Sequence, residues 1–151
     1  MRVDFHWDRT NLIEVRAAFG RLLDSADKGS RAFIDDISGN VYKQSQLLVP
    51  VRTGRLKKSG RRALAKKILT KYQGSVEYGN TGTTLTSSGN DYAIYAHEIP
   101  PGTGGRWHTG NRHKPPTSYK YLFRPAHVEY ARADPKLYRH YVARFEKDWH
   151  N

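Results

Sequence analysis

Three histidines, a glutamate and an arginine in the second half of the chain are the residues whose types could carry out acid–base chemistry. His97 is followed directly by Glu98, and a nearby segment holds His108, Arg112 and His113. A small ribonuclease needs a general base, a general acid and a cation around a phosphate. The two later histidines lie among Gly and Pro residues, which form a poor platform for precisely held catalytic groups. We therefore expect the chain not to be an enzyme, with a small basic ribonuclease as the less favoured alternative.

The same histidines are poorly spaced for a metal ion. His108 and His113 are five positions apart, which does not place both on one helical face, and no carboxylate is close to them in the sequence. The chain has no cysteine, which excludes thiolate catalysis, disulfides and cysteine-based zinc sites. The glycines at 102, 104 and 105 lack the Lys-Ser/Thr pair of a phosphate-binding loop. We therefore expect no bound metal and no cofactor.

Phosphate binding is the chemistry that the sequence favours most. From Arg52 to Lys71, nine residues are Lys or Arg and none is Asp or Glu. The whole chain has 26 Lys and Arg against 14 Asp and Glu, a formal net charge of +12, so this segment supplies most of the imbalance. A concentrated positive surface attracts polyanions and can hold a duplex through its phosphates without reading its sequence. Nucleic acid is therefore the first partner to consider.

The composition indicates a single domain, residues 1–151, with a thin core. A length of 151 residues suits one domain, but only 37% of the residues are hydrophobic and the mean hydropathy is −0.79. Ten Tyr and three Trp exceed what such a core needs, and these rings are frequent anchors of protein interfaces. No run approaches the roughly 18 apolar residues that span a membrane. We expect a soluble protein with a partner surface and no membrane partner.

The elements expected before the basic segment are helices. Apolar residues at helical spacing predict a first helix over about 11–25, within an N-terminal helical extension of residues 1–29. A break at Lys28-Gly29-Ser30 separates it from a second apolar stripe. That stripe runs from Phe33 to Leu48, and Pro50 stops the helix.

The basic segment itself leads into a predicted β-hairpin. Residues 63–72 suit a strand or a helix by periodicity alone, but the following Gln73-Gly74 turn and the β-prone segment 75–78 favour an antiparallel hairpin. Two long loops then follow. The first, 79–90, has no charged residue, and the second, 99–118, is rich in Pro and Gly and too long to be a mere connector. We expect these to be interaction loops.

The C-terminal part is expected to be a kinked helix or a pair of helices. Pro125 suits a first helical turn, and Asp134-Pro135 suits a second helix start. Aromatic and apolar residues at helical spacing then predict a core stripe that includes Tyr138, Tyr141, Phe145 and Trp149. The fold class is therefore α+β, with N-terminal helices, a small antiparallel sheet and C-terminal helices.

Three motifs, in order, resemble the tail-component family of tailed bacteriophages, whose members are small neck proteins. Pro50–Leu56 is similar to its Pro-Val-x-Thr-Gly-x-Leu element, and Tyr92–Glu98 to its Tyr-Ala-x-Tyr-x-x-Glu element. Leu122–Ala126 is similar to the Arg-Pro-Ala element that opens the C-terminal helix. The resemblance covers roughly residues 30–145. It departs from the family after Glu98, where Ile99–Thr103 stands in place of Phe-Gly-Thr and the following loop is longer.

The resemblance implies a structural virion protein that joins or completes the head–tail connector. Such subunits form a ring, here expected to hold six or twelve copies, around the path of double-stranded DNA. The partners would be other copies of the chain, the neighbouring connector or adaptor proteins, and tail proteins. The location would be the neck or tail of the virion, after assembly in the host cytoplasm. A sequence-nonspecific DNA-binding module acting outside the virion is the alternative.

Two groups of residues are expected to carry this function. The cations of the basic segment would face the DNA channel, although they could instead face acidic neighbouring subunits or solvent. These channel residues are Arg52, Arg55, Lys57, Lys58, Arg61, Arg62, Lys66 and Lys67. Aromatic and basic residues of the second loop and the segment after it would contact neighbouring subunits. These interface residues are Trp107, His108, Arg112, Tyr119, Tyr121, Phe123 and Arg124.

Overall fold

A computed structural model gives the fold of most of the chain. The structure describes residues 9–51, 54–79, 84–85, 89–98 and 120–149. A long helix, a two-stranded antiparallel sheet and C-terminal helices confirm the expected α+β class. Most of loop 79–90 and all of loop 99–118 lie outside the described residues.

The first element of the described chain is one long helix, α1, Arg9–Leu48, of 40 residues. At 1.5 Å per residue it is about 60 Å long. The predicted break at Lys28-Gly29-Ser30 is wrong, because Gly29 lies inside the helix and serves packing. A Cβ added at Gly29 would lie 2.9 Å from Cδ1 of Tyr141, so the missing side chain is what lets the C-terminal helix approach. The hydroxyls of Ser30 and Tyr141 then share a 2.8 Å hydrogen bond.

A short helix and a hairpin follow α1. Helix α2 spans Arg55–Lys58, strand β1 spans Arg61–Ile68 and strand β2 spans Lys71–Glu77, with the two strands antiparallel. The hairpin is confirmed, but its predicted turn at Gln73-Gly74 is wrong. The strands turn at Leu69-Thr70, and Gly74 lies within β2, where an added Cβ would be 3.1 Å from Cγ2 of Ile34 on α1.

A bulge in β1 determines which side chains face α1. The register shifts between Ala63 and Lys66, so the strand changes which of its alternate residues point toward the helix. As a result Arg62 and Lys67, of opposite parity, both reach acids on α1. Between them the backbone N–H of Ala65 donates to Oδ1 of Asp35 at 2.7 Å. These contacts hold the hairpin along the helix.

Two helices end the described chain, as the sequence predicted. Helix α5 spans Phe123–Ala131 and helix α6 spans Ala133–Trp149. The boundary falls at Arg132 rather than at Asp134-Pro135, so Pro135 occupies the first turn of α6, where its missing N–H costs no hydrogen bond. Tyr141 is half-buried against α1, whereas Tyr138 is 70% exposed and does not belong to the predicted core stripe. The side chain of Trp149 lies outside the described residues.

The core lies at the C-terminal end of α1. Its buried residues come from four segments, one of which is helix α3, Tyr92–Glu98. They are Val49, Leu56, Ala93 and Tyr121. The half-buried ring of Tyr92 packs against them. The side chain of Tyr95 lies outside the described residues. This small core anchors α2, α3 and the start of α5 to one end of the long helix.

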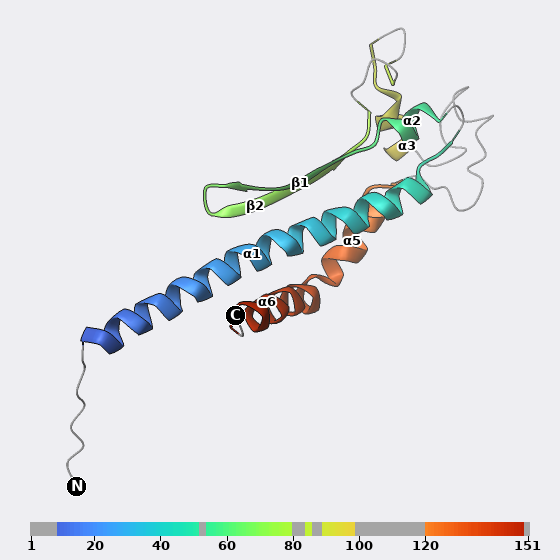
Figure 1. Ribbon diagram of the computed structural model, residues 1–151. Coiled ribbons are helices and arrows are strands. Elements are labelled where there is room, and N and C mark those ends of the chain that lie inside the picture. The colour runs from blue at the N-terminus through green and yellow to red at the C-terminus, as the bar shows by residue number, and fades with distance from the viewer. Residues whose placement is uncertain (1–8, 52–53, 80–83, 86–88, 99–119, 150–151) are drawn as a thin grey trace.

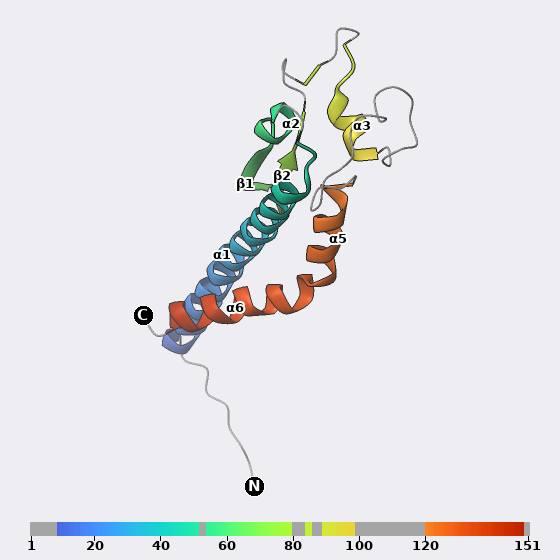
Figure 2. The ribbon, with the colours of Figure 1, turned by 90° about the vertical axis from the view of Figure 1, so that its right-hand side faces the viewer.

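The arrangement is elongated rather than layered around one centre. Figures 1 and 2 show the hairpin and α6 running beside α1 on different sides, with α2 and α3 gathered at its C-terminal end. The tip of the hairpin is tied to Asp27 through Lys67 and Tyr72, and the end of α6 is tied to Ser25 through Asp148. The first turns of α1 therefore extend past both of its partners.

The acids that tie these ends to α1 predict how the fold responds to acid. Hydrogen bonds from Lys67 and Tyr72 lower the pKa of Asp27 below its ordinary value of 3.8, and a hydrogen bond from Ser25 lowers the pKa of Asp148. A lowered pKa in the folded state means that each contact stabilises the fold above about pH 4 and is lost as the pH falls further.

We therefore expect the hairpin tip to leave α1 in acid before the core unfolds. The measurement is the pH dependence of the Tyr72 ring resonances, with Asp27→Asn as the control that should remove the transition. A transition that persists in Asp27→Asn would contradict the assignment.

Candidate nucleic-acid interface

Helix α2 presents three cations on one side and one apolar anchor on the other. Leu56 is buried in the core, while Arg55, Lys57 and Lys58 are exposed. The helix starts after Gly54, whose φ of 75° is a backbone conformation that favours glycine. It is fixed at its other end by Ser59, whose hydroxyl donates to the Leu56 carbonyl and accepts from the backbone N–H of Gly79. A rigid base therefore positions the three charges.

Strand β1 adds two more exposed cations, one at its end next to α2 and one near the hairpin turn. Arg61 and Lys66 are exposed, with Arg61 opposite Glu77 and Lys66 opposite Gln73 in the hairpin register. In the part of the chain that the structure describes, no carboxylate lies within 4.0 Å of the charged groups of α2, Arg61 or Lys66. These five positive charges are available to a partner.

The other two described channel candidates are directed toward α1. The Arg62 guanidinium donates to Oγ of Ser38 at 3.2 Å and to the carbonyl of Asp35 at 2.6 Å, and it lies 3.8 Å from the Asp35 carboxylate. Lys67 forms an ion pair with Asp27. Both charges are thus partly neutralised within the chain and have a structural role. Arg52 lies outside the described residues.

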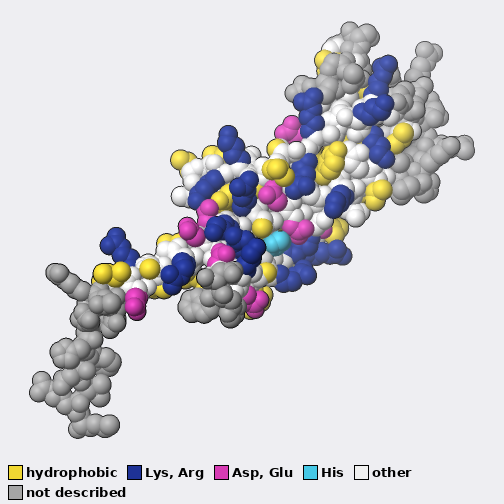
Figure 3. Space-filling model, in the orientation of Figure 1, with side chains coloured by type: hydrophobic (Ala, Val, Ile, Leu, Met, Phe, Trp, Pro, Cys, Tyr) yellow, Lys and Arg dark blue, Asp and Glu magenta, His cyan; other side chains and the backbone are white. Residues whose placement is uncertain are grey.

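The surface of α2 and the hairpin is better suited to contacts with the DNA phosphate backbone than to binding a ligand in a shaped pocket. Figure 3 shows Lys and Arg side chains spread along the length of the visible face, both near α2 and beside the hairpin. A spread of exposed cations fits phosphate contacts along a duplex, which position a protein without specifying a sequence. The geometry therefore agrees with sequence-nonspecific binding.

The predicted subunit-interface residues lie in different environments. Tyr121 is only 2% exposed and belongs to the monomer core, where its ring meets Tyr78 edge-on at 5.2 Å, so it offers no surface to a neighbour. Phe123 is exposed, stacks on His127 at 5.9 Å and lies under the Lys120 ammonium. Arg124 is exposed on α5. The remaining candidates lie outside the described residues: Trp107, His108, Arg112 and Tyr119.

His97, the histidine considered for acid–base chemistry, has both ring nitrogens engaged within the chain. Its Nδ1 lies 2.6 Å from the Glu98 carboxylate, and its Nε2 accepts a 3.3 Å hydrogen bond from the backbone N–H of Phe123. Its carbonyl also accepts from the N–H of Lys120 at 2.7 Å. These contacts join α3 to the start of α5, which supports a structural role for His97.

A charged groove between α1 and α6 contains residues that the sequence did not single out. It has a volume of about 400 Å³ and is open to solvent. Beside it, Lys136 bridges Asp36 and Glu129, and Glu129 is only 6% exposed. Asn40 also donates to Glu129, at 3.4 Å. Ligand pockets are mostly apolar. We therefore interpret the charged residues beside this groove as a network that attaches α5 and α6 to α1.

This network gives a stability prediction. Replacing Lys136 by Met leaves the buried Glu129 without its cation, and we expect a loss of about 2–3 kcal/mol in the free energy of unfolding. The double variant Glu129→Gln with Lys136→Met should regain at least half of it, because no buried charge remains. Urea unfolding measures both, with the exposed Lys43→Met as control. Equal stability of the single variant and the control would contradict the prediction.

Comparison of the chain with protein-family models, with curated proteins and with solved structures finds no match. Among the helices of the described ranges, none is long and apolar enough to cross a membrane.

Proposed function

We propose that the chain is a structural subunit of a tailed-phage neck, which forms a ring around the DNA path and joins or completes the head–tail connector. The proposal combines the order of the three sequence motifs with one structural observation. That observation is the exposed cationic group on α2 and β1, held on a rigid base and without acidic partners in the described chain.

The shape of the subunit supports an assembling protein. Its core is small and lies at one end, while a helix about 60 Å long carries much of the remaining structure. Subunits that bind head to tail about a rotation axis close into rings. In a ring that directs α2 and β1 inward, their cations would contact phosphates from every side of the duplex. The aromatic residues expected at subunit interfaces would then be available to bind neighbouring neck proteins.

The charge distribution alone also fits the alternative of a DNA-binding module outside the virion. The two functions differ in assembly, because the module needs only a monomer or a dimer on DNA. Sedimentation of the protein alone and with its neighbouring connector and tail proteins tests the proposal. We expect particles of six or twelve copies, and a monomer or dimer under every condition, with or without DNA, would support the alternative.

A further inference from the structure

The apolar seam of α1 is longer than the structure that covers it. Its positions alternate in steps of three and four residues, the spacing of a helix-packing seam. In order they are Leu12, Val15, Phe19, Leu22, Ala26, Gly29 and Phe33. The C-terminal part of the seam is covered by α6, with Tyr141 over Gly29 and the ring of His140 6.1 Å from that of Phe33.

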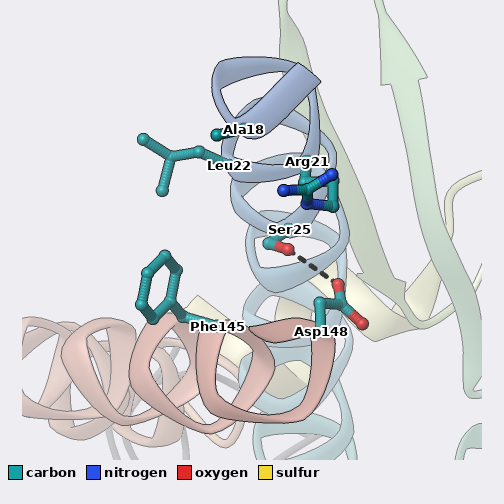
Figure 4. Close-up of a pocket in the computed structure, with 6 residues that line it drawn as sticks. All are labelled: Ala18, Arg21, Leu22, Ser25, Phe145 and Asp148. Atoms are coloured by element: carbon teal, nitrogen blue, oxygen red, sulfur yellow. Dashed lines mark hydrogen bonds between the residues drawn. The ribbon is translucent and has the colours of Figure 1, made fainter. Parts of the chain in front are cut away.

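The N-terminal part of the seam has no cover within the described residues. Figure 4 shows where the contact ends, with Leu22 of α1 and Phe145 of α6 on one side and Ser25 donating to Asp148 on the other. The hollow between them measures only about 10 Å³, room for one water molecule. Beyond it α1 continues without a neighbour among the residues that the structure describes.

The uncovered part is a large apolar surface for a monomer. Six large apolar side chains on this segment are 43–69% exposed. Four belong to the seam, Leu12, Val15, Phe19 and Leu22, and two flank it, Ile13 and Leu23. Together they leave on the order of 500 Å² of apolar area in water, which is near the upper limit for the surface of a monomer. It is also more than half of the roughly 800 Å² that each partner buries in a standard interface.

A second uncovered apolar cluster lies at the hairpin tip. Leu69 is 92% exposed, and its φ of 57° is a left-handed conformation, which Gly or Asn usually adopts in tight turns. Ile68, the last residue of β1, is also exposed. A branched apolar residue at this position strains the backbone of the monomer, and its exposed side chain contributes almost no buried apolar area in return. Such a residue is better explained by a contact outside the monomer.

The part of the seam from Leu12 to Phe19 lies beyond the point where the tip is attached to α1 of the same chain. The tip is held at Asp27 by Lys67 and Tyr72, and Phe19 lies eight residues further toward the N-terminus, about 12 Å along the helix axis. A head-to-tail ring contact, however, requires two different surfaces on the same chain, one given and one received. The seam and the tip are such a pair.

We propose that the N-terminal seam of α1 in one copy binds the hairpin tip of the next copy. The inference rests on the proposed ring, and it names the contact that builds it. One contact then covers both apolar clusters and explains why α1 extends past its own partners. The association is mainly apolar, so it withstands salt that removes DNA from the cations of α2.

Disulfide cross-linking tests the contact directly, because the chain has no native cysteine. Chains carrying Leu23→Cys are mixed with chains carrying Leu69→Cys, alone and with the neighbouring neck proteins, and oxidised. We expect a heterodimer that links positions 23 and 69. Leu47, which is 58% exposed near the C-terminal end of α1 against 69% for Leu23, provides the control: Leu47→Cys replaces Leu23→Cys and should give little product.

Two results would overturn the contact. One is a mixture in which the 23–69 product never exceeds that of the control. The other is a product formed only between two Leu23→Cys chains, which would mean that the seam pairs with itself. A ring observed by mass without the 23–69 product would leave the ring standing and remove this contact. The 23–69 product in open chains of subunits would support this contact and argue against the closed ring.

A second variant gives effects of opposite sign. Leu69→Asn suits the left-handed turn, so we expect the Tm of the monomer to rise by about 2–4 °C. The same change removes the apolar tip, so we expect association between copies to weaken at least tenfold. A variant that is more stable but associates as strongly as the natural chain would contradict the proposal.

Discussion

Replacing Arg55, Lys57, Lys58 and Arg61 by Gln is expected to weaken binding to duplex DNA by roughly a hundredfold or more at 0.1 M salt. All four residues are exposed on α2 and the adjoining start of β1. Each cation that contacts a phosphate releases condensed counterions, and each lost contact reduces the salt dependence of log K by about 0.9. The slope of log K against log salt should therefore fall by about 3 to 4, and the loss should be the same for unrelated sequences.

A matched variant separates this site from the net charge of the chain. Replacing Arg16, Lys43, Arg132 and Arg139 by Gln removes the same four charges from exposed positions on α1, α6 and the α5–α6 boundary. We expect less than a fivefold loss of affinity in this variant, because long-range attraction is screened at this salt concentration. Fluorescence anisotropy of a labelled duplex measures both variants. Equal losses in both would show that only net charge matters and that α2 and β1 are not the interface.

The expected result with the largest effect on stability concerns Gly79→Ala. Gly79 follows β2 with a φ of 87°, and an added Cβ would lie 2.3 Å from Oδ2 of Asp91 and 2.7 Å from the Cβ of Ala93. Its N–H donates to the buried hydroxyl of Ser59. Alanine would thus strain the backbone and push apart the hairpin and α3 at the core. We expect the free energy of unfolding to fall by about 3–4 kcal/mol.

Gly89→Ala is the control for the backbone term alone. Gly89 has a similar φ of 80°, but an added Cβ there meets nothing within 4 Å. We expect it to cost only about 1 kcal/mol. Thermal and urea unfolding of the two variants separate the steric contact from the backbone strain. Equal losses in the two variants would mean that the contact of Gly79 with Asp91 and Ala93 can relax.

The elements predicted from the spacing of apolar residues and from β-prone residues are present in the structure. The helix break and the hairpin turn that were predicted from glycines are misplaced. Helical spacing predicted the C-terminal helices, and β-prone residues predicted the hairpin. Gly29 and Gly74 were interpreted as a break and a turn, yet both lie inside regular elements where α1 meets a neighbour. A glycine that interrupts a helix and a glycine that lets two elements approach look alike in one sequence. Only the packing partner, Tyr141 or Ile34, distinguishes them.

The candidate site was predicted in composition but not in detail. The run of cations is visible in the sequence, and five of its members are exposed on α2 and β1. Lys66 is available to a partner, whereas Lys67 is directed toward α1, and this difference depends on the bulge in β1. No local sequence pattern predicts that bulge. The acids that hold the hairpin, Asp27 and Asp35, are eight residues apart on α1. Their spacing is a signal only when the register of the hairpin is known.

The uncovered seam of α1 was also visible, because its apolar spacing predicted a helix. It was interpreted as a separate first helix within an N-terminal extension. The structure shows instead that the apolar residues from Leu12 to Leu23 remain largely exposed on one continuous helix. Periodicity indicates that a helix has an apolar face, but what covers that face depends on distant parts of the chain or on other chains.

Electron cryo-microscopy of the protein, alone and with its neighbouring connector and tail proteins, tests the neck proposal most directly. We expect ring-shaped class averages with six-fold or twelve-fold symmetry, a pore wide enough for a duplex, and Lys57, Lys58 and Arg61 facing the pore. Particles that remain monomeric with every neighbouring protein, or a ring whose pore is lined by other elements while α2 faces outward, would contradict it.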